Sequence, residues 1–494
     1  MSLQILLAAT YLGLLVCQTA CLPSSRPQAT TPLDDYVNKP DSTYEYRDMG
    51  NSYRGDGYTS YFINMTSQTW LSPSLVSRSV WWHYMVINVP DKIEYPDTAF
   101  IYITGGSNTG SVPEISSSDC LFSTVTCFTT GTVTATLFQI PNERIVFSED
   151  PLKKERDEDA IIAYTWYHFL KHPDSPEYIL RLPMTKAVVR AMDTVEDFSK
   201  KKNPAANITK FVIGGASKRG WTTWTTGIVD KRVVGMIPIV EDLLNLQKNM
   251  HHHYRMLGGW TFAFSDYHEL NVTAYLDDPI MTQLAYIVDP YAYLDRLTMP
   301  KMIINSGGDE FFMPDDNHYF WDALPDQKYF RMLPNAEHSC AGHYTSLIFS
   351  VRAFYLSILT NTARPNMTWK MDATADGGTI TMSADIKPAD VKVFHATTVQ
   401  SKRKDFRLLT LPPGSKDPIP QPVFWFSKDL QPDANGNYVA SMATPEEGWR
   451  AFFIQATFPG PKGSLFEYTT QANIIPYTDA FPDCQGTACL GTLV

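Results

Sequence analysis

A serine in this sequence stands in a short run of small residues directly after a predicted strand. The strand covers residues 210–213, and the run that follows reads Gly-Gly-Ala-Ser-Lys-Arg-Gly, with Ser217 at its centre. Where a strand turns at once into a helix, the side chain at the turn projects above the sheet, and the tight turn requires small neighbours. The usual pattern is G-x-S-x-G, whereas here Arg219 takes the fifth position and Gly220 follows it. We expect Ser217 to be a nucleophile.

A nucleophilic serine requires a base, and the base requires an acid that orients it. Asp309 follows the predicted strand 300–305, and His338 follows the predicted strand 329–333. Both therefore come after the carboxyl ends of strands, where parallel sheets gather their active sites. We predict a triad of Ser217, His338 and Asp309.

Alternatives to two members of this triad stay open. Glu241 and Asp242 follow the strand after the serine and are the other candidates for the acid. His343 is the other candidate for the base, but we expect it deeper in a helix, which favours His338.

Acyl transfer also needs backbone N–H groups that bind the oxyanion. The N–H of Lys218 would open the helix after Ser217, where the helix dipole favours negative charge. A second donor normally comes from the loop after an early strand. Gly106 lies in such a position, after the predicted strand 98–104. Lys218 and Gly106 are therefore the predicted oxyanion donors.

Two sets of residues are candidates for substrate recognition. The aromatic-rich segment 250–267 predicts a lid over an apolar pocket, although ordinary packing within a lid explains these aromatics about as well. They are Tyr254, Trp260, Phe262, Phe264 and Tyr267. An aminopeptidase would in addition need carboxylates that hold the substrate ammonium. By residue type alone, the candidates are Glu158, Asp159, Glu241 and Asp242.

Three consecutive histidines, His251, His252 and His253, resemble a metal cluster by composition. Consecutive residues of a helix cannot all face one ion, because they point in different directions around its axis. We interpret them as a surface run, and we expect neither a metal nor a cofactor in this protein.

The pattern of elements agrees with a site at the edge of a parallel sheet. Residues 34–364 alternate short apolar runs with helical patterns, and the long connection at about 241–290 is the predicted lid. This alternation predicts a mostly parallel sheet with helices on both faces. The predicted strands are 98–104, 142–147, 210–213, 233–240, 300–305 and 329–333, and the predicted helices are 157–170, 183–201 and 340–360.

In residues 365–494 the alternation of strand and helix patterns ends, and the sequence predicts strands only. An Asn-Gly dipeptide at 435–436 is typical of a hairpin turn. We therefore expect a small C-terminal β-sandwich domain. Its predicted strands are 379–384, 391–396, 423–426, 438–441 and 449–457.

The composition is that of a folded globular protein, with 44% hydrophobic and 19% charged residues among 494. The formal net charge of −11 argues against a nucleic-acid partner, which would need a concentrated positive field. The apolar, uncharged stretch at the start predicts a signal peptide at 1–21 and a linker at 22–33. No later stretch predicts a membrane span, so after signal cleavage we expect a secreted, extracellular protein.

Glycosylation sequons and cysteines agree with secretion. Four N-x-Thr sequons occur, at Asn64, Asn207, Asn271 and Asn366. The spacing of the cysteines predicts two short disulfide loops, with Cys340 left either free or paired with Cys21. The predicted pairs are Cys120 with Cys127 and Cys484 with Cys489.

Several segments together resemble the PhoPQ-activated pathogenicity-related family, whose eukaryotic branch includes secreted autocrine proliferation repressors. The resemblance covers nearly all of the mature chain and is carried by residues 102–108, 157–166, 211–224, 233–240 and 305–312. It implies an α/β-hydrolase fold with a C-terminal β domain, and Ser217, Asp309 and His338 as the triad.

Two functions follow as expectations. The first is a secreted serine hydrolase of the peptidase or esterase class, which works through an acyl-enzyme. The second is a secreted signalling protein that has a hydrolase scaffold and acts by binding a cell-surface receptor. A purely structural glycoprotein is a weaker third possibility, because fold alone does not decide function.

Overall fold

The computed structural model describes residues 30–494 apart from 413 and 416. The predicted signal peptide, most of the predicted linker and Cys21 lie outside the described residues. Within the described part, no helix is both long and apolar enough to cross a membrane.

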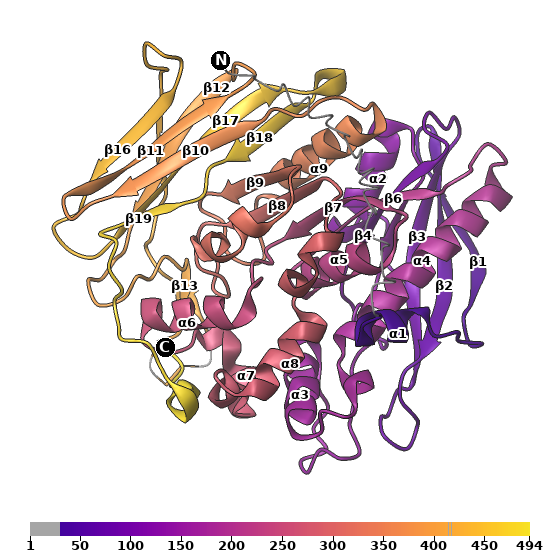
Figure 1. The fold of residues 1–494 in the computed structure, drawn as a ribbon. Helices are drawn as coiled ribbons and strands as arrows, with labels where there is room; N and C mark the ends of the chain where they lie inside the picture. The colour runs from indigo at the N-terminus through magenta and orange to yellow at the C-terminus, as the bar shows by residue number, and fades with distance from the viewer. Residues whose placement is uncertain (1–29, 413, 416) are drawn as a thin grey trace, which may run out of the picture.

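A nine-stranded sheet forms the centre of the described chain, in the order β1-β2-β3-β5-β4-β6-β7-β8-β9 (Figure 1). From β5 onward along this order neighbouring strands are parallel, whereas β1, β2 and β3 pair antiparallel. The mostly parallel sheet confirms the predicted fold class. The strands are β1 (Glu45–Arg54), β2 (Tyr58–Thr69), β3 (Val80–Pro90), β4 (Thr98–Ile103), β5 (Thr134–Leu137), β6 (Lys210–Ala216), β7 (Val233–Ile239), β8 (Lys301–Ser306) and β9 (Lys328–Leu333).

Helices cover both faces of this sheet because successive side chains of a strand point to opposite faces. Ile101 and Ile213 pack in one core, and their neighbours Phe100 and Val212 pack in the other. The first core contains side chains of α1 (Pro32–Asn38), α4 (Arg181–Lys202) and α5 (Lys218–Val229), and the second contains side chains of α2 (Ser118–Thr130) and α9 (Tyr344–Leu359).

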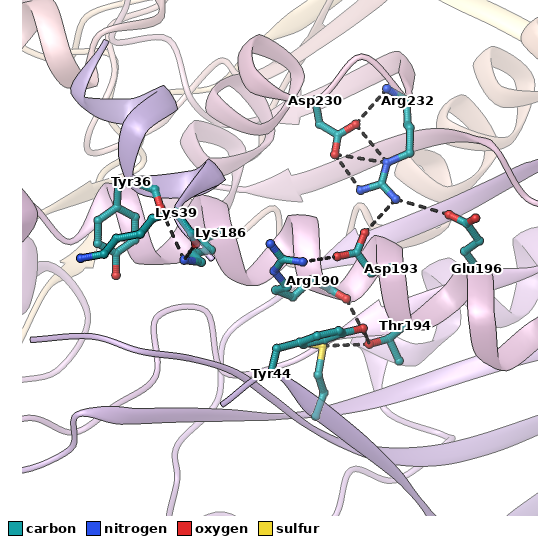
Figure 2. A network of polar contacts seen from close by, with 11 residues as sticks. Tyr36, Lys39, Tyr44, Lys186, Arg190, Asp193, Thr194, Glu196, Asp230 and Arg232 are labelled. Atoms are coloured by element: carbon teal, nitrogen blue, oxygen red, sulfur yellow. Dashed lines mark hydrogen bonds and ion pairs between the residues drawn. The ribbon is translucent and has the colours of Figure 1, made fainter. Parts of the chain in front are cut away.

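Cation–π contacts connect α4 with two tyrosines near the start of the described chain, Tyr36 and Tyr44. Figure 2 shows Lys186 beside Tyr36 and Arg190 beside Tyr44, with 5.4 and 5.3 Å between cation and ring centroid. Arg190 also forms a 2.7 Å ion pair with Asp193, one helical turn further along. These contacts connect α4 with α1 and with the segment just before β1.

The structure confirms the three predicted helices, as α3 (Glu158–Lys171), α4 and α9, but corrects the segment between β4 and α3. The prediction of a disulfide loop at 120–127 is wrong, because both cysteines lie within α2. The predicted strand 142–147 is also wrong. That segment is irregular and forms single bridges to Val76, Ser107 and Arg156. Strands β1, β2, β3 and β5 have no predicted counterpart.

The segment between β7 and β8 forms the lid (residues 241–290). It consists of short helical pieces that lie over the carboxyl ends of the strands, near α3 (Figure 1). Its elements are α6 (Leu246–Leu257), η2 (Phe262–Phe264), α7 (Ser265–Glu269), η3 (Val272–Tyr275) and α8 (Pro279–Val288).

The C-terminal part forms two larger antiparallel sheets with a shared core, at one end of the α/β layers (Figure 1), and a separate pair of short strands, β13 (Leu409–Thr410) with β14 (Ile419–Pro420). One sheet has the order β10-β11-β16, and the other has the order β15-β12-β17-β18, with β19 on β17. The predicted strand 423–426 is displaced to β15. The strands are β10 (Met367–Ala373), β11 (Gly377–Ala384), β12 (Asp390–Thr397), β15 (Phe426–Asp429), β16 (Tyr438–Ala443), β17 (Arg450–Pro459), β18 (Leu465–Thr469) and β19 (Asn473–Ile475).

After β19, residues 477–494, here called the tail, return to the lid (Figure 1). The backbone of Trp260 donates to Thr492 and accepts from Val494, each at 2.8 Å. The predicted disulfide between Cys484 and Cys489 is present in the tail and packs beside Trp260. The tail therefore fixes the outer side of the lid.

Candidate active site

Ser217 lies on a strained turn between β6 and α5. Its backbone has φ 58° and ψ −129°, in the positive-φ region that costs a residue with a side chain about 1–3 kcal/mol. Such strain persists at functional sites when the surrounding structure imposes it. The turn holds the hydroxyl above the carboxyl edge of the sheet.

Two glycines explain why the turn tolerates the shifted pattern. A Cβ atom on Gly215 would lie 2.9 Å from the Arg219 Cβ, and one on Gly220 would lie 2.9 Å from the carbonyl of Ile239 in β7. The second glycine thus lets α5 pack closely on the neighbouring strand. In the usual G-x-S-x-G pattern the last glycine would be residue 219. Here residue 220 is the one that approaches β7, so the glycine is required at 220.

The structure brings the three predicted triad residues together. The Ser217 hydroxyl donates to His338 Nε2 at 2.8 Å. On the other side of the ring, Nδ1 lies 2.9 Å from both carboxylate oxygens of Asp309. Since an ionised carboxylate only accepts, Nδ1 carries the proton and Nε2 is left as the acceptor for the serine. This tautomer is the one that a general base requires.

The loop after β8 orients the acid and sets the charge of the base. Asp309 Oδ1 accepts from the backbone N–H groups of Phe311 and Phe312, at 2.7 and 3.2 Å. Burial lowers the pKa of His338, but the Asp309 carboxylate outweighs burial and holds that pKa above its ordinary value. Glu310 accepts from the His338 backbone at 3.0 Å. Burial, with the charge of Asp309, raises the pKa of Glu310 to about 7.

The alternative residues lie elsewhere. His343 precedes α9, and its Nε2 contacts the carbonyl of Asn335 at 3.1 Å, whereas His338 Nε2 contacts the serine hydroxyl. Glu241 and Asp242 are buried after β7, and burial raises the pKa of each, to about 8 for Asp242. Among the described acids, Asp309 is the one that contacts His338 Nδ1.

A cluster of four charges surrounds the start of α5. The Lys218 ammonium lies 2.8 Å from Glu158 and 2.8 Å from Asp159, the residues that begin α3. Arg219 pairs with Glu158 and donates to the carbonyl of Ile140. Glu158 and Asp159 are among the predicted candidates for binding a substrate ammonium, but here the cations of Lys218 and Arg219 pair with them. Sequence reasoning missed these pairs, because only the fold brings α3 and α5 together.

The two predicted oxyanion donors lie in suitable elements. Lys218 is the first residue of α5, so its backbone N–H has no acceptor within the helix. Gly106 follows β4 in the neighbouring loop, with φ at +123°. The Arg219 guanidinium packs against Gly105, where a Cβ would lie 2.4 Å from Nη2. The assignment of Lys218 and Gly106 to the oxyanion stays a prediction.

Two hollows meet at Ser217. The first, here called the lid pocket, lies between the lid, α3 and α5 and is mostly apolar. Phe264 and Tyr267 of the predicted aromatic lid line it, while Tyr254 and Trp260 pack with the tail instead. The second, here called the histidine-side hollow, lies between α2 and the loop before α9 and includes His338.

The histidine run is not a surface feature, so that prediction is wrong. His252 and His253 are buried because α6 turns them toward the protein interior. His252 Nε2 lies 2.8 Å from Asp315, and His253 Nε2 accepts from the N–H of Thr261 at 3.0 Å. These contacts give both buried rings a partner within the protein.

The remaining predicted site residues have mixed outcomes. The predicted Cys120–Cys127 disulfide is wrong. Both thiols are buried and free, since seven residues of α-helix separate their Cα atoms by about 10 Å, beyond the reach of a disulfide. Cys340 is also buried, 3.3 Å from the Ser306 hydroxyl, and forms no disulfide with another described cysteine. Three of the predicted glycosylation residues are exposed and Asn64 is half-buried in β2; the exposed ones are Asn207, Asn271 and Asn366.

The strand order, the strained serine turn and the Ser–His–Asp contact define an α/β-hydrolase scaffold. The chain belongs to the family described as PhoPQ-activated pathogenicity-related protein, which matches residues 33–407. It is 41% identical over 468 residues to autocrine proliferation repressor protein A of Dictyostelium discoideum, with 92% of each chain covered.

Solved esterase structures are more distantly similar. Acetyl xylan esterase 1 of a Thermoanaerobacterium species has a TM-score of 0.45 and 15% identity, over 65% of this chain and 93% of that one. A glucuronoyl esterase of Solibacter usitatus has a TM-score of 0.40 and 12% identity, over 65% of this chain and 91% of that one.

Proposed function

We propose that the protein is a serine hydrolase that works through an acyl-enzyme. The observation that supports this most is the continuous contact from Ser217 through His338 to Asp309, built on a strained turn. His338 takes the serine proton as the hydroxyl oxygen attacks a carbonyl carbon. The N–H groups of Lys218 and Gly106 bind the oxyanion, and His338 then returns the proton to the leaving group.

Hydrolysis of a broad panel of activated esters and peptide anilides tests this proposal. We expect turnover that Ser217→Ala abolishes and that Ser441→Ala, which removes an exposed hydroxyl from the C-terminal sheet, leaves unchanged. Equal turnover by Ser217→Ala and the unmodified protein would refute the proposal.

We also propose that the protein is secreted and N-glycosylated. The exposed side chains of Asn207, Asn271 and Asn366 and the Cys484–Cys489 disulfide support this. Recovery of the protein from culture medium, with a mass that falls after enzymatic deglycosylation, is the expected result. Retention in the cell without glycan would contradict it.

A signalling role is the second candidate, favoured by the name of the 41% identical relative. In that case the folded surface would bind a cell-surface receptor. The Ser217→Ala protein would then change the proliferation of the producing cells as strongly as the unmodified protein does. Loss of the effect in Ser217→Ala would favour the hydrolase alone.

A further inference from the structure

The two hollows beside Ser217 differ in chemistry, and among the described residues Ser217 is the one that lines both. This inference rests on the proposed hydrolase function and concerns the kind of substrate. A substrate bound at Ser217 would place the two sides of its scissile bond in different surroundings.

Apolar side chains line most of the lid pocket. Side chains from the lid and from the loop after β8 form most of its wall, for example Leu246, Met250, Phe264, Met281 and Phe312. All but Met250 are largely buried, so an apolar group placed there would leave water almost completely. Burial of each methylene in such surroundings contributes about 0.8 kcal/mol.

Asp159 and Arg181 of this pocket contact other groups of the protein, although the Nε and Nη2 atoms of Arg181 have no hydrogen-bond partner among the described residues. Asp159 accepts from Lys218 and from the Tyr267 hydroxyl, at 2.8 and 3.0 Å. Arg181 donates to the carbonyl of Lys218 at 2.6 Å and lies over the Trp221 ring. These contacts leave the carboxylate of Asp159 compensated, so it is not available for a substrate ammonium.

Glu241 is the other acid of the lid pocket. Its side chain is buried and accepts from the backbone N–H of Leu243 at 3.3 Å. Burial raises the pKa of Glu241 well above its ordinary value, although the charge of Arg181 opposes this. Because the positive charge of Arg181 acts on Glu241, this acid is already compensated within the protein, and the mostly apolar wall of the pocket favours an uncharged apolar group.

The histidine-side hollow is where the leaving group must lie. His338 lines this hollow, and its imidazolium has to protonate the leaving oxygen at short range. Polar side chains line part of this hollow, among them the exposed residues Ser118, Ser339 and Tyr344. The Ser339 hydroxyl donates to Glu337 at 2.5 Å, and the Asp119 carboxylate accepts from the Thr104 hydroxyl at 2.8 Å. Such groups hydrogen-bond a hydroxyl-bearing alcohol and gain little from an apolar one.

We propose that the substrates are esters of an apolar carboxylic acid with a polar, hydroxyl-bearing alcohol. The acyl group occupies the lid pocket and the alcohol occupies the histidine-side hollow. In the first step the Ser217 oxygen bonds to the carbonyl carbon, the ester C–O bond breaks, and His338 transfers the serine proton to the alcohol. Water then attacks the acyl-serine, which releases the acid and restores the hydroxyl.

The acyl preference is tested with 4-nitrophenyl esters from acetate to decanoate. We expect kcat/KM to rise by about fourfold per added methylene until the pocket is full. Met281→Trp, which fills the pocket, should move the optimum to shorter chains. Met250→Ala, at a half-buried position, should move it to longer ones. Thermal unfolding checks that both variants are folded.

The alcohol preference is tested with glyceryl and ethyl esters of one acid. The glyceryl ester should be hydrolysed at least several-fold faster, and Asp119→Asn with Tyr344→Phe should slow the glyceryl ester more than the ethyl ester, so that the difference between them is lost.

Labelling by a small fluorophosphonate tests the hydrolase function separately from the proposed substrate class. If Ser217 is labelled, the hydrolase function stands. The substrate assignment is then overturned by any of three results: no chain-length preference, no preference for the glyceryl ester, or faster cleavage of aminoacyl 4-nitroanilides than of esters. Absence of labelling would overturn the hydrolase function itself.

Discussion

His338 is held between the serine hydroxyl and the Asp309 carboxylate, and its charge decides whether the site can react. A base must be neutral, so reactivity should rise as pH rises through the pKa of His338. The Asp309 carboxylate holds this pKa above the ordinary value. The same pair stabilises the fold most at low pH, where the imidazole is charged, and this contribution is lost as pH rises through the raised pKa.

We therefore expect the rate of fluorophosphonate labelling to reach half its maximum above about pH 6.5, the ordinary value for histidine. The measurement is the labelling rate between pH 5 and 9. Glu310→Gln is measured alongside, because burial raises the pKa of Glu310 to about 7 and the charge of Glu310 also raises the pKa of His338. A midpoint at or below the ordinary value would contradict the Asp309–His338 contact.

Replacement of the acid tests its role directly. Asp309→Asn should keep the fold but favour the wrong tautomer of His338, and turnover of an activated ester should fall roughly 10³–10⁴-fold. Asp242→Asn, the matched change at the buried acid after β7, should leave far more activity. A larger loss in Asp242→Asn than in Asp309→Asn would reassign the acid.

At the scale of elements, the site depends on how closely α5 approaches β7. Gly220 allows this approach, since an added Cβ would meet Ile239 and Glu241. Overpacking of this kind costs about 1–3 kcal/mol. We expect Gly220→Ala to lower the free energy of unfolding in urea by that amount and to slow labelling of Ser217. An unchanged free energy of unfolding would show that α5 can move away without cost.

The elements also show what the sequence could and could not predict. The strand before Ser217 and the strands before Asp309 and His338 were predictable, because short apolar runs end in small or polar residues there. Helix α2 was missed because Cys120 and Cys127 suggested a loop, whereas a spacing of seven residues also places side chains on one face of a helix.

The ion pairs of the site could not be predicted. Lys218 meets Glu158 and Asp159 only after α3 and α5 have packed, and a single sequence carries no signal of that contact. The buried state of His252 likewise depends on its partner Asp315, which belongs to the loop after β8.

At the scale of the whole molecule, the tail connects the C-terminal sheets to the lid. Arg255 of α6 pairs with Asp483 at 2.9 Å, and the Cys484–Cys489 disulfide packs with Trp260 and Phe264. Phe264 also lines the lid pocket. The tail thus supports the wall of the pocket from outside.

Removal of this disulfide should loosen the tail. Closure of so short a loop contributes about 2 kcal/mol on the chain-entropy estimate. We expect Cys484→Ser with Cys489→Ser to lower the melting temperature and to speed proteolysis within residues 477–494, with no effect of reductant on the double variant. Identical proteolysis with and without the disulfide would contradict a supporting role for the tail.

The central claim is that Ser217 is a nucleophile activated by His338, and mass-spectrometric mapping of a fluorophosphonate adduct tests it most directly. The purified protein, His338→Ala and Ser441→Ala would be labelled side by side and digested. We predict one adduct, on the peptide that contains Ser217, present in Ser441→Ala and absent in His338→Ala. An adduct on another residue, or no adduct on the folded protein, would contradict the claim.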